Sequence, residues 1–206
     1  MKTFLRCTTL AIALGFPFAA MADTPEAAPV LALNSALIAT MKAASAGDSF
    51  AARVAALDPV VKQSFNLPVV EQNSVGFLWS TIPAAQQATL STVFEQFTVA
   101  SYVSQFKSYG GTQIQLLPAE KSLGDKKIVE TQIVPGGGGS PTEIDYVVAN
   151  GDNGWQITDV LLNGTISQVA VHSSDFSSLV TSGDASKLIT ALQSKVSMLS
   201  GGTDGH

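Results

Sequence analysis

Apolar residues in the first half of the chain recur every three or four positions, which is the period of an amphipathic helix. This spacing predicts a helix over residues 30–47. Asp48 and Asp58 each precede a further apolar run and read as N-cap residues, so they predict two short helices, the second beginning at Pro59. Another helix is expected over residues 66–79, where Asn66-Leu67-Pro68 repeats the same signal.

The longest helical pattern covers residues 81–109 and stops at Gly110-Gly111. Its apolar positions change side part-way along the helix. One side carries Leu90, Val93, Phe94 and Phe97, and the opposite side carries Val99, Tyr102, Val103, Phe106 and Tyr109. A helix that is apolar on two sides must be covered on both. Two interpretations stay open: a buried helix between two layers, or one wall of a cavity.

From Thr112 onward the period changes to the alternation that is typical of strands. Turns rich in Gly, Asn and Asp separate the segments. Four strands are therefore expected, over residues 113–116, 127–134, 143–149 and 155–162, and short turns between them predict a curved antiparallel sheet. Two helices should follow, over 166–182 and 185–199. Helices, then a strand meander, then helices indicate one α+β domain without internal repeats.

The N-terminus has the pattern of a cleavable secretory signal peptide. Lys2 and Arg6 precede an apolar run over residues 8–20, and Ala20-Met21-Ala22 is a small-x-small cleavage pattern. The run is shorter than the roughly 20 residues that span a bilayer, although a retained anchor is the competing interpretation. We expect a signal peptide over 1–22, export to the periplasm, and a flexible leader over 23–29. The domain should cover 30–199, and a disordered tail 200–206.

Composition narrows the possible functions. The one cysteine, Cys7, lies in the predicted signal peptide, so the exported chain would have no disulfide and no thiol chemistry. Hydrophobic residues make up 46% of the chain and charged residues 13%, which indicates a substantial core and a weakly charged surface. The net charge of −5 argues against nucleic acid and against retention on anionic lipid surfaces.

No catalytic or metal-binding motif stands out. His206 is the last residue, and His172 stands alone on a predicted helix, where a surface or boundary position is expected. The glycines over 136–139 lack the Lys-Ser/Thr of a phosphate-binding loop and are expected to form a hairpin loop. Asp152 and Asn153 lack the closing glutamate of a calcium loop, so a turn is expected there as well. We therefore predict no enzyme activity, no metal and no cofactor.

The order and spacing of several motifs, over roughly residues 30–199, carry a resemblance to a known family. These are Phe65-Asn66-Leu67-Pro68, Val75-Gly76-Phe77-Leu78-Trp79, Gln86-Gln87, Tyr102 with Phe106 and Tyr109-Gly110-Gly111, Gly154 to Val160, Asn163 to Ser167, and Asp175-Phe176, with Gly183, Leu188, Leu192 and Lys195 at the end. The chain resembles the periplasmic phospholipid carriers typified by MlaC, also called toluene-tolerance auxiliary proteins. Within them it is most similar to the hopanoid-associated HpnM branch.

The resemblance implies a curved antiparallel four-stranded sheet wrapped by helices, an NTF2-like or MlaC-like fold. It also implies lipid tails buried between sheet and helices. A monomer would dock transiently to an inner-membrane ABC transporter, for which it is an auxiliary component. The cargo would be hopanoid or phospholipid. Ser173 stands where family members often have an arginine, which would suit a less charged cargo such as a hopanoid.

The candidate lipid-binding residues combine large side chains of the helices with strand positions chosen by period 2. They are Trp79, Phe94, Phe97, Tyr102, Phe106, Ile114, Leu116, Val129, Ile133, Tyr146, Val148, Ile157, Val160, Val169 and Phe176. A slip of one residue would reverse a strand, so each choice of face is an expectation. Composition alone does not distinguish a filled core from a hollow one, and on that ground alone a filled core is favoured.

Two other functions remain open from the sequence. One is a small curved-sheet enzyme acting on an apolar substrate, which would need a buried ionisable pair such as Asp159, or Asp145 beside Tyr146. Asp159 is more simply expected to bond a neighbouring turn. The other is a non-binding adaptor of a membrane lipid transporter, which a solid core without a cavity would favour.

Overall fold

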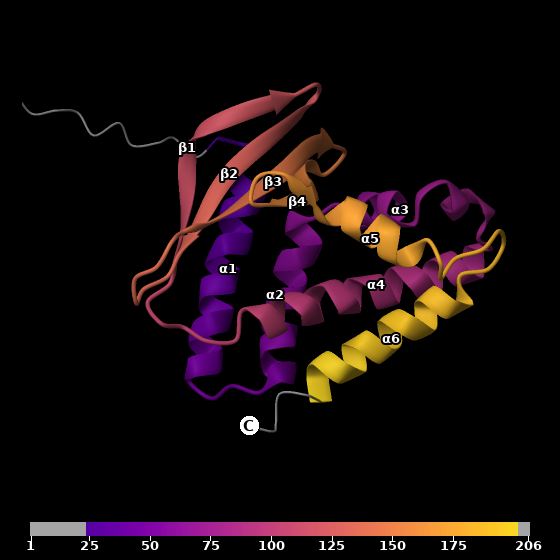
Figure 1. Ribbon diagram of the computed structural model, residues 1–206, viewed down its shortest axis with the longest axis horizontal. Helices are drawn as coiled ribbons and strands as arrows, with labels where there is room; N and C mark the ends of the chain where they lie inside the picture. Colours follow the sequence, from indigo (N-terminus) through magenta and orange to yellow (C-terminus); the bar gives the residue numbers. More distant parts are fainter. Residues whose placement is uncertain (1–23, 202–206) are drawn as a thin grey trace, which may run out of the picture.

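The computed structural model describes residues 24–201, so the predicted signal peptide and most of the predicted tail lie outside the described residues. The chain forms one α+β domain in which a curved antiparallel sheet lies against a group of helices (Figure 1). None of the helices within 24–201 reaches the length and hydropathy that crossing a membrane requires. One continuous core joins the helices to a single face of the sheet.

The first helix, α1 (Ala28–Ser45), begins inside the segment that was expected to be a leader. A turn precedes it, and Ala27 is already buried at 1% exposure. The helix buries Val30, Leu33 and Leu37, whose spacing follows the apolar stripe of the sequence. The first helix therefore begins two residues before the predicted start of the domain at residue 30.

The prediction of two short helices over residues 48–65 is wrong, because α2 (Phe50–Ser64) is one helix that continues through Pro59. The N-cap is Ser49, whose side chain accepts a hydrogen bond from the Ala52 amide at 3.1 Å, and not Asp48. Proline removes one backbone donor. Leu57 and Val61, four residues apart on either side of Pro59, are both fully buried, and this continuous stripe holds the helix together.

Asn66 caps α3 (Leu67–Val75), as predicted, by accepting a hydrogen bond from the Val69 amide at 3.3 Å. The helix does not run to Trp79. Gly76, with φ of +74°, ends it, and the chain continues as a tighter 3₁₀ turn, η1 (Gly76–Thr81). The helix predicted over 66–79 is therefore an α-helix only as far as Val75.

The long helix α4 (Ala84–Gln105) is covered on both sides, as its two apolar faces require. Leu90, Val93 and Phe94 are buried on one side, and Val99 and Val103 on the other. It packs against α6 as well as against α1, α2 and α3.

The helix α4 ends four residues before the predicted Tyr109, where Phe106 leaves the helical region. Buried Arg53 donates from Nη1 to the carbonyl oxygen of Val103 at 3.2 Å. A cation is well placed at this negative end of a helix dipole. Arg53 therefore satisfies part of the α4 terminus from a neighbouring helix, which a sequence pattern does not reveal.

The sheet has five strands in the order β1-β2-β3-β4-β5, with every neighbouring pair antiparallel. Their bounds are β1 (Gln113–Leu123), β2 (Lys126–Val134), β3 (Thr142–Gly151), β4 (Gly154–Leu162) and β5 (Ile166–Ser167). The prediction of four strands missed β5, because a two-residue strand is too short to show a period. The first strand is longer than its predicted span and carries an irregularity between Leu116 and Glu120. Both glycine-rich turns join antiparallel strands, as expected.

The pairing register places all eight predicted inward strand residues on the same face of the sheet. Val129 lies opposite Tyr146, which in turn lies opposite Val160. Ile157 and Val160 are three apart, so strict alternation would put them on opposite faces. A bulge at Thr158 resolves this, because Val148 pairs with Ile157 while Val147 pairs with Asp159.

The single helix predicted over residues 166–182 is wrong at both ends. Strand β5 occupies its start, Ser167 caps α5 (Gln168–Phe176), and a turn near Gly183 precedes the next helix. The last helix, α6 (Ser186–Gly201), packs along α4 and extends into the segment that was predicted as a tail. It buries Leu188 and Leu192.

Candidate functional site

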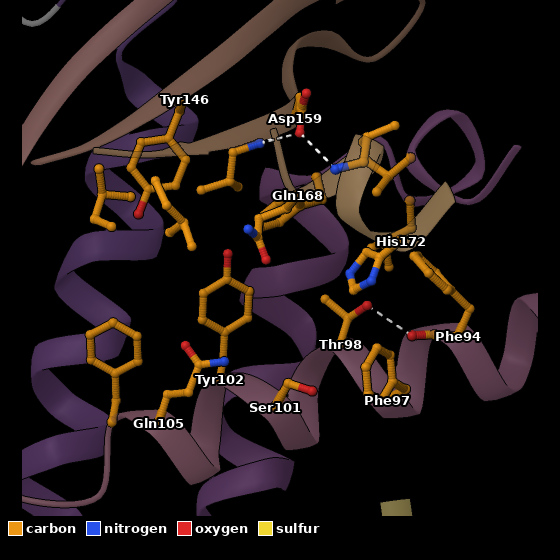
Figure 2. Close-up of a pocket in the computed structure, with 18 of the residues that line it drawn as sticks. Phe94, Phe97, Thr98, Ser101, Tyr102, Gln105, Tyr146, Asp159, Gln168 and His172 are labelled. Carbon is orange, nitrogen blue, oxygen red and sulfur yellow. Dashed lines mark hydrogen bonds between the residues drawn. The ribbon is translucent and has the colours of Figure 1, made fainter. Parts of the chain in front are cut away.

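A cavity of about 300 Å³ lies between α4, α3, α5 and the inward face of the sheet. Most of its wall is apolar, and Figure 2 shows the aromatic side chains of α4 and β3 around one space. The lining residues are Phe65, Leu67, Val70, Phe94, Phe97, Thr98, Ser101, Tyr102, Gln105, Phe106, Ile133, Ile144, Tyr146, Asp159, Val160, Leu162, Gln168, Val169 and His172. The volume is at the lower end of the roughly 300–1,000 Å³ that is usual for small-molecule sites.

The structure brings about half of the predicted site residues to this cavity. Those that line it are Phe94, Phe97, Tyr102, Phe106, Ile133, Tyr146, Val160 and Val169. Val129, Val148 and Ile157 share the inward face but are buried in the core, away from the cavity wall. Trp79, Ile114 and Leu116 are half-buried at the edge of the core. Phe176 lines an adjoining groove.

Sequence reasoning missed two kinds of lining residue. The apolar ones include Phe65, Leu67 and Ile144. Phe65 and Leu67 belong to a motif that carried the family resemblance, and Ile144 has the same parity as Tyr146 on β3, so both signals were present. The polar ones, such as Ser101 and Gln168, had no signal, because small and uncharged residues are equally common on surfaces.

Several aromatic side chains line the cavity. The ring centroid of Tyr102 lies 5.9 Å from that of Phe65 and 6.2 Å from that of Phe106, on which Tyr102 stacks. The Tyr146 hydroxyl and the buried Asn34 Oδ1 lie 3.3 Å apart, so the hydroxyl donates its proton to this oxygen. The Tyr102 hydroxyl has no hydrogen-bond partner among the described residues, and it points into the cavity in Figure 2. Burial raises the pKa of both phenols, so both stay neutral.

His172 occupies the boundary position that was expected, between the cavity and aromatic rings of two helices. Its ring stacks on Phe176 at 5.2 Å and meets Phe97 and Phe94 edge-on at 5.8 and 6.2 Å. Burial lowers the pKa of His172, although Asp175 and Asp159 act in the opposite direction. The imidazole is therefore held neutral and acts as one more flat ring in the wall.

Asp159 bonds the neighbouring turn, as the simpler expectation had it. Its Oδ1 accepts hydrogen bonds from the amides of Val160 and Val169, at 2.8 and 3.1 Å. Its Oδ2 accepts a hydrogen bond from the Ser167 hydroxyl at 2.5 Å. Ser167 is also the N-cap of α5. Asp159 thereby fixes the start of α5 against the sheet, and both of its oxygens are occupied.

A second hollow, of about 550 Å³, lies between α4, α5 and α6 and shares Phe97, Ser101 and His172 with the cavity. Its other lining residues are mostly apolar: Asp175, Phe176, Leu179, Leu188, Ala191, Leu192, Lys195 and Leu199. The two spaces therefore adjoin at these three side chains.

The charge of the cavity lining is unusual for a phosphate site. No lysine or arginine is among its lining residues, and its polar groups are hydroxyls, amides, neutral His172 and hydrogen-bonded Asp159. An anionic group held inside would have no cation beside it. The cavity suits hydrocarbon with, at most, an uncharged polar group.

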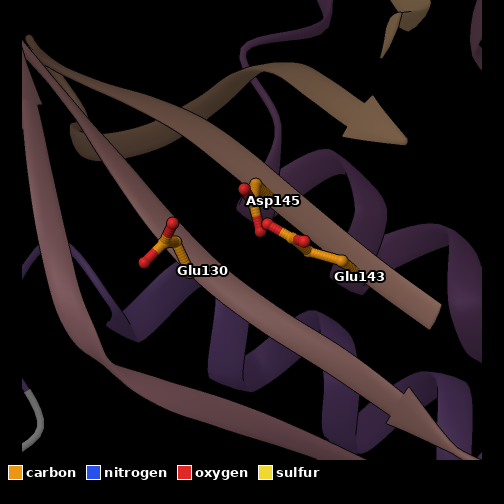
Figure 3. A group of neighbouring side chains, drawn as sticks. All are labelled: Glu130, Glu143 and Asp145. Atoms are coloured by element: carbon orange, nitrogen blue, oxygen red, sulfur yellow. The ribbon is translucent and has the colours of Figure 1, made fainter. Parts of the chain in front are cut away.

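The opposite face of the sheet carries the one group of carboxylates within residues 24–201 that could hold a metal ion: Glu130, Glu143 and Asp145 (Figure 3). One ligand oxygen from each lies within 4.8 Å of the others. Lys121 forms an ion pair with Glu130. Burial raises the pKa of Asp145 to about 6, and the charges of Glu143 and Glu130 add to this shift. Because Asp145 and Tyr146 are consecutive residues of β3, their side chains point to opposite faces of the sheet, and Asp145 does not share the cavity with Tyr146.

Of three comparisons with known proteins, one shows the fold and one shows the family. A search of curated proteins gave no match. Among solved structures, the chain is similar to a phospholipid-binding protein from Ralstonia solanacearum in complex with a phospholipid, at a TM-score of 0.71 and 17% identity, covering 84% of this chain and 98% of that one. At this identity the likeness shows the fold. The model of the family described as MlaC protein matches residues 32–194. The chain therefore belongs to the MlaC family.

Proposed function

We propose that this protein is an exported lipid-binding transfer protein that carries a lipid between membranes with its hydrocarbon buried in the cavity. The observation that carries the proposal is the cavity itself, which is walled by apolar and aromatic side chains of α3, α4, α5 and the sheet. Membership of the MlaC family and the phospholipid complex of the Ralstonia protein support the same function. Each buried methylene contributes about 0.8 kcal/mol, so a long hydrocarbon needs no ion pair.

The cargo is hopanoid or phospholipid, and a lining without lysine or arginine favours a lipid whose anionic group, if it has one, stays outside. At about 300 Å³ the cavity holds only part of such a molecule. The hollow between α4, α5 and α6 offers room for the remainder once Phe97 or His172 turns aside. The predicted signal peptide implies the periplasm, and an inner-membrane transporter is the expected transient partner of a monomer.

Binding is better supported than catalysis. The two carboxylates that an enzyme could have used are accounted for: Asp159 is fully hydrogen-bonded, and Asp145 lies on the far face of the sheet. A solid core without a cavity would have favoured a non-binding adaptor, and the cavity therefore argues against that function.

The test is native mass spectrometry of protein purified from a hopanoid-producing host, with lipid extraction to identify the cargo. The Ser101→Trp variant fills the space between both hollows and should lose bound lipid. Gln96→Trp places the same side chain at an exposed position of the same helix and should keep bound lipid. If wild-type protein carries no lipid and takes up none when lipid is added, the proposal fails.

A further inference from the structure

The turn η1 exposes one aromatic side chain almost completely. Phe77 is 88% exposed, more than any other large apolar side chain within residues 24–201. Figure 1 places this connection between α3 and α4 at one end of the molecule, beside the loop from α5 to α6 and away from the β1–β2 hairpin. An exposed phenylalanine at an end of a molecule is free to contact a large, flat partner.

The turn that carries Phe77 is held in one conformation by hydrogen bonds of its own. Thr81 Oγ1 donates to the Leu78 carbonyl at 2.7 Å, Ser80 Oγ donates to that of Phe77 at 3.4 Å, and Gln87 Nε2 donates to that of Trp79 at 2.9 Å. The Gly183 amide donates to Thr81 Oγ1 at 3.2 Å and ties the turn to the neighbouring loop. Backbone groups that are satisfied internally can approach an apolar medium at little cost.

The surroundings of Phe77 lack charge. No acidic or basic residue occurs from Gln72 to Phe94, although the whole chain has a net charge of −5. Two acids are hydrogen-bonded next to this stretch. Buried Glu71 accepts a hydrogen bond from the Ser91 hydroxyl at 2.6 Å, and the Asp184 carboxylate is engaged by Gln86 and Ser186. An anionic bilayer would repel most of this protein, and this end, which has few charges, is the part that can approach it. Specific protein interfaces, by contrast, usually have a charged and polar rim.

Trp79 adds a second feature of a bilayer interface. It is half-buried against the core, and its indole N–H has no hydrogen-bond partner among the described residues. Tryptophan is enriched at the boundary between lipid headgroups and hydrocarbon, where the ring is apolar and the N–H meets polar groups. Phe77 and Trp79 together therefore match lipid better than they match a protein pocket.

We propose that η1 (Gly76–Thr81) is a membrane-docking tip that inserts Phe77 into the interface of a lipid bilayer. The insertion is weak, because one phenylalanine without a basic residue gives transient contact, which suits a protein that must leave again. Helix α3, which ends at this tip, supplies Leu67 and Val70 to the cavity wall. The bilayer therefore contacts an element that also lines the cavity. This inference goes beyond the proposed function and holds for either cargo.

The experiment is sedimentation of the full exported chain with phosphatidylcholine vesicles, with and without phosphatidylglycerol. Phe77→Ser should lower the vesicle-bound partition coefficient about tenfold, the effect of losing one partly inserted aromatic ring. Leu123→Ser removes a 52%-exposed apolar side chain from the β1–β2 hairpin and should leave binding unchanged. In a Trp155→Phe background, Trp79 is the one remaining tryptophan, and its emission should shift to the blue when vesicles are added.

Three outcomes overturn the inference: wild-type protein that binds no vesicles, Phe77→Ser protein that binds as the wild type does, and Leu123→Ser protein that loses as much binding as Phe77→Ser. Loss of capture by a purified transporter, with vesicle binding unchanged, would assign Phe77 to a protein contact and also overturn it. Because Phe77 is exposed, the variant should keep the wild-type unfolding midpoint. Lipid content, measured separately, tests the proposed function independently.

Discussion

The two faces of β2 and β3 bury different kinds of side chain. Towards the helices, Val129 is packed in the apolar core, and Tyr146 presents a hydrogen-bonded phenol to the cavity. On the other face, their chain neighbours Glu130 and Asp145 are almost as buried, at 7% and 2% exposure, yet both are acids. The inward face of β2 and β3 borders a cavity and carries no carboxylate of these two strands. The outer face carries buried carboxylates and borders no such cavity. A lipid cavity needs an apolar inward face, and placing an acid on that face should disrupt the fold.

The largest effect is expected when a carboxylate is moved to the inward face. Val129→Glu places an acid at a position of 1% exposure without a cation beside it, and should destabilise the fold by about 4 kcal/mol. Urea denaturation at pH 8 measures this. Val129→Leu, which keeps the position apolar, should cost less than about 1.5 kcal/mol. A Val129→Glu protein of wild-type stability would show that the inward face tolerates charge.

A smaller effect is expected on the outer face, where the acid can be neutralised. The raised pKa of Asp145, about 6 against an ordinary value near 3.8, means that the folded state binds the proton more tightly than the unfolded one. Its contribution to stability is full below about pH 4 and is lost as the pH rises through 6. Asp145→Asn should therefore gain about 1–2 kcal/mol relative to wild type at pH 8.

The gain of Asp145→Asn should disappear at pH 4, where the wild-type acid is already protonated. Denaturation of both proteins at the two pH values gives the comparison. An equal difference at pH 4 and pH 8 would mean that Asp145 does not titrate in this range, and that the outer face is not governed by its charge.

The smallest effect concerns the two phenols of the inward face. Tyr146→Phe should cost about 1 kcal/mol, because it leaves the buried Asn34 Oδ1 without its donor. Tyr102→Phe should leave stability within about 0.5 kcal/mol of wild type, because its hydroxyl has no partner within the described residues. Thermal unfolding of both variants separates them. Equal losses would show that a bound water or lipid already engages Tyr102.

Sequence reasoning worked best where one local signal decides the outcome. Asn66 was recognised as a cap because its side chain needs only the amide of Val69, three residues away. The strand residues chosen by period 2 lie on one face of the sheet, and Ile157 and Val160, which strict alternation would separate, share that face because of the bulge at Thr158. Reasoning failed at Pro59, where the burial of Leu57 and Val61 overrides a local helix breaker. It also failed at the end of α4, where Arg53 comes from another helix.

The cavity was only half predictable for the same reason. Phe94, Phe97, Tyr102 and Tyr146 were expected to face inward, and they line it. Val148 and Ile157 have the same pattern and the same face, yet they are packed solid. Whether an inward residue meets another side chain or empty space depends on how far the helices stand from the sheet. That distance is not encoded at the residue itself.

The order of apolar positions, caps and turns by itself determined an α+β chain with a strand meander between helices, and its motif order pointed to the MlaC family. These features are local, so the covalent sequence specifies them directly. Tertiary structure alone decided that the cavity and the second hollow adjoin at Phe97 and His172. It also decided that three acids lie together on the outer face of the sheet and that Phe77 is exposed to solvent. Each depends on which distant segments meet, and contacts between distant segments have no period along the chain.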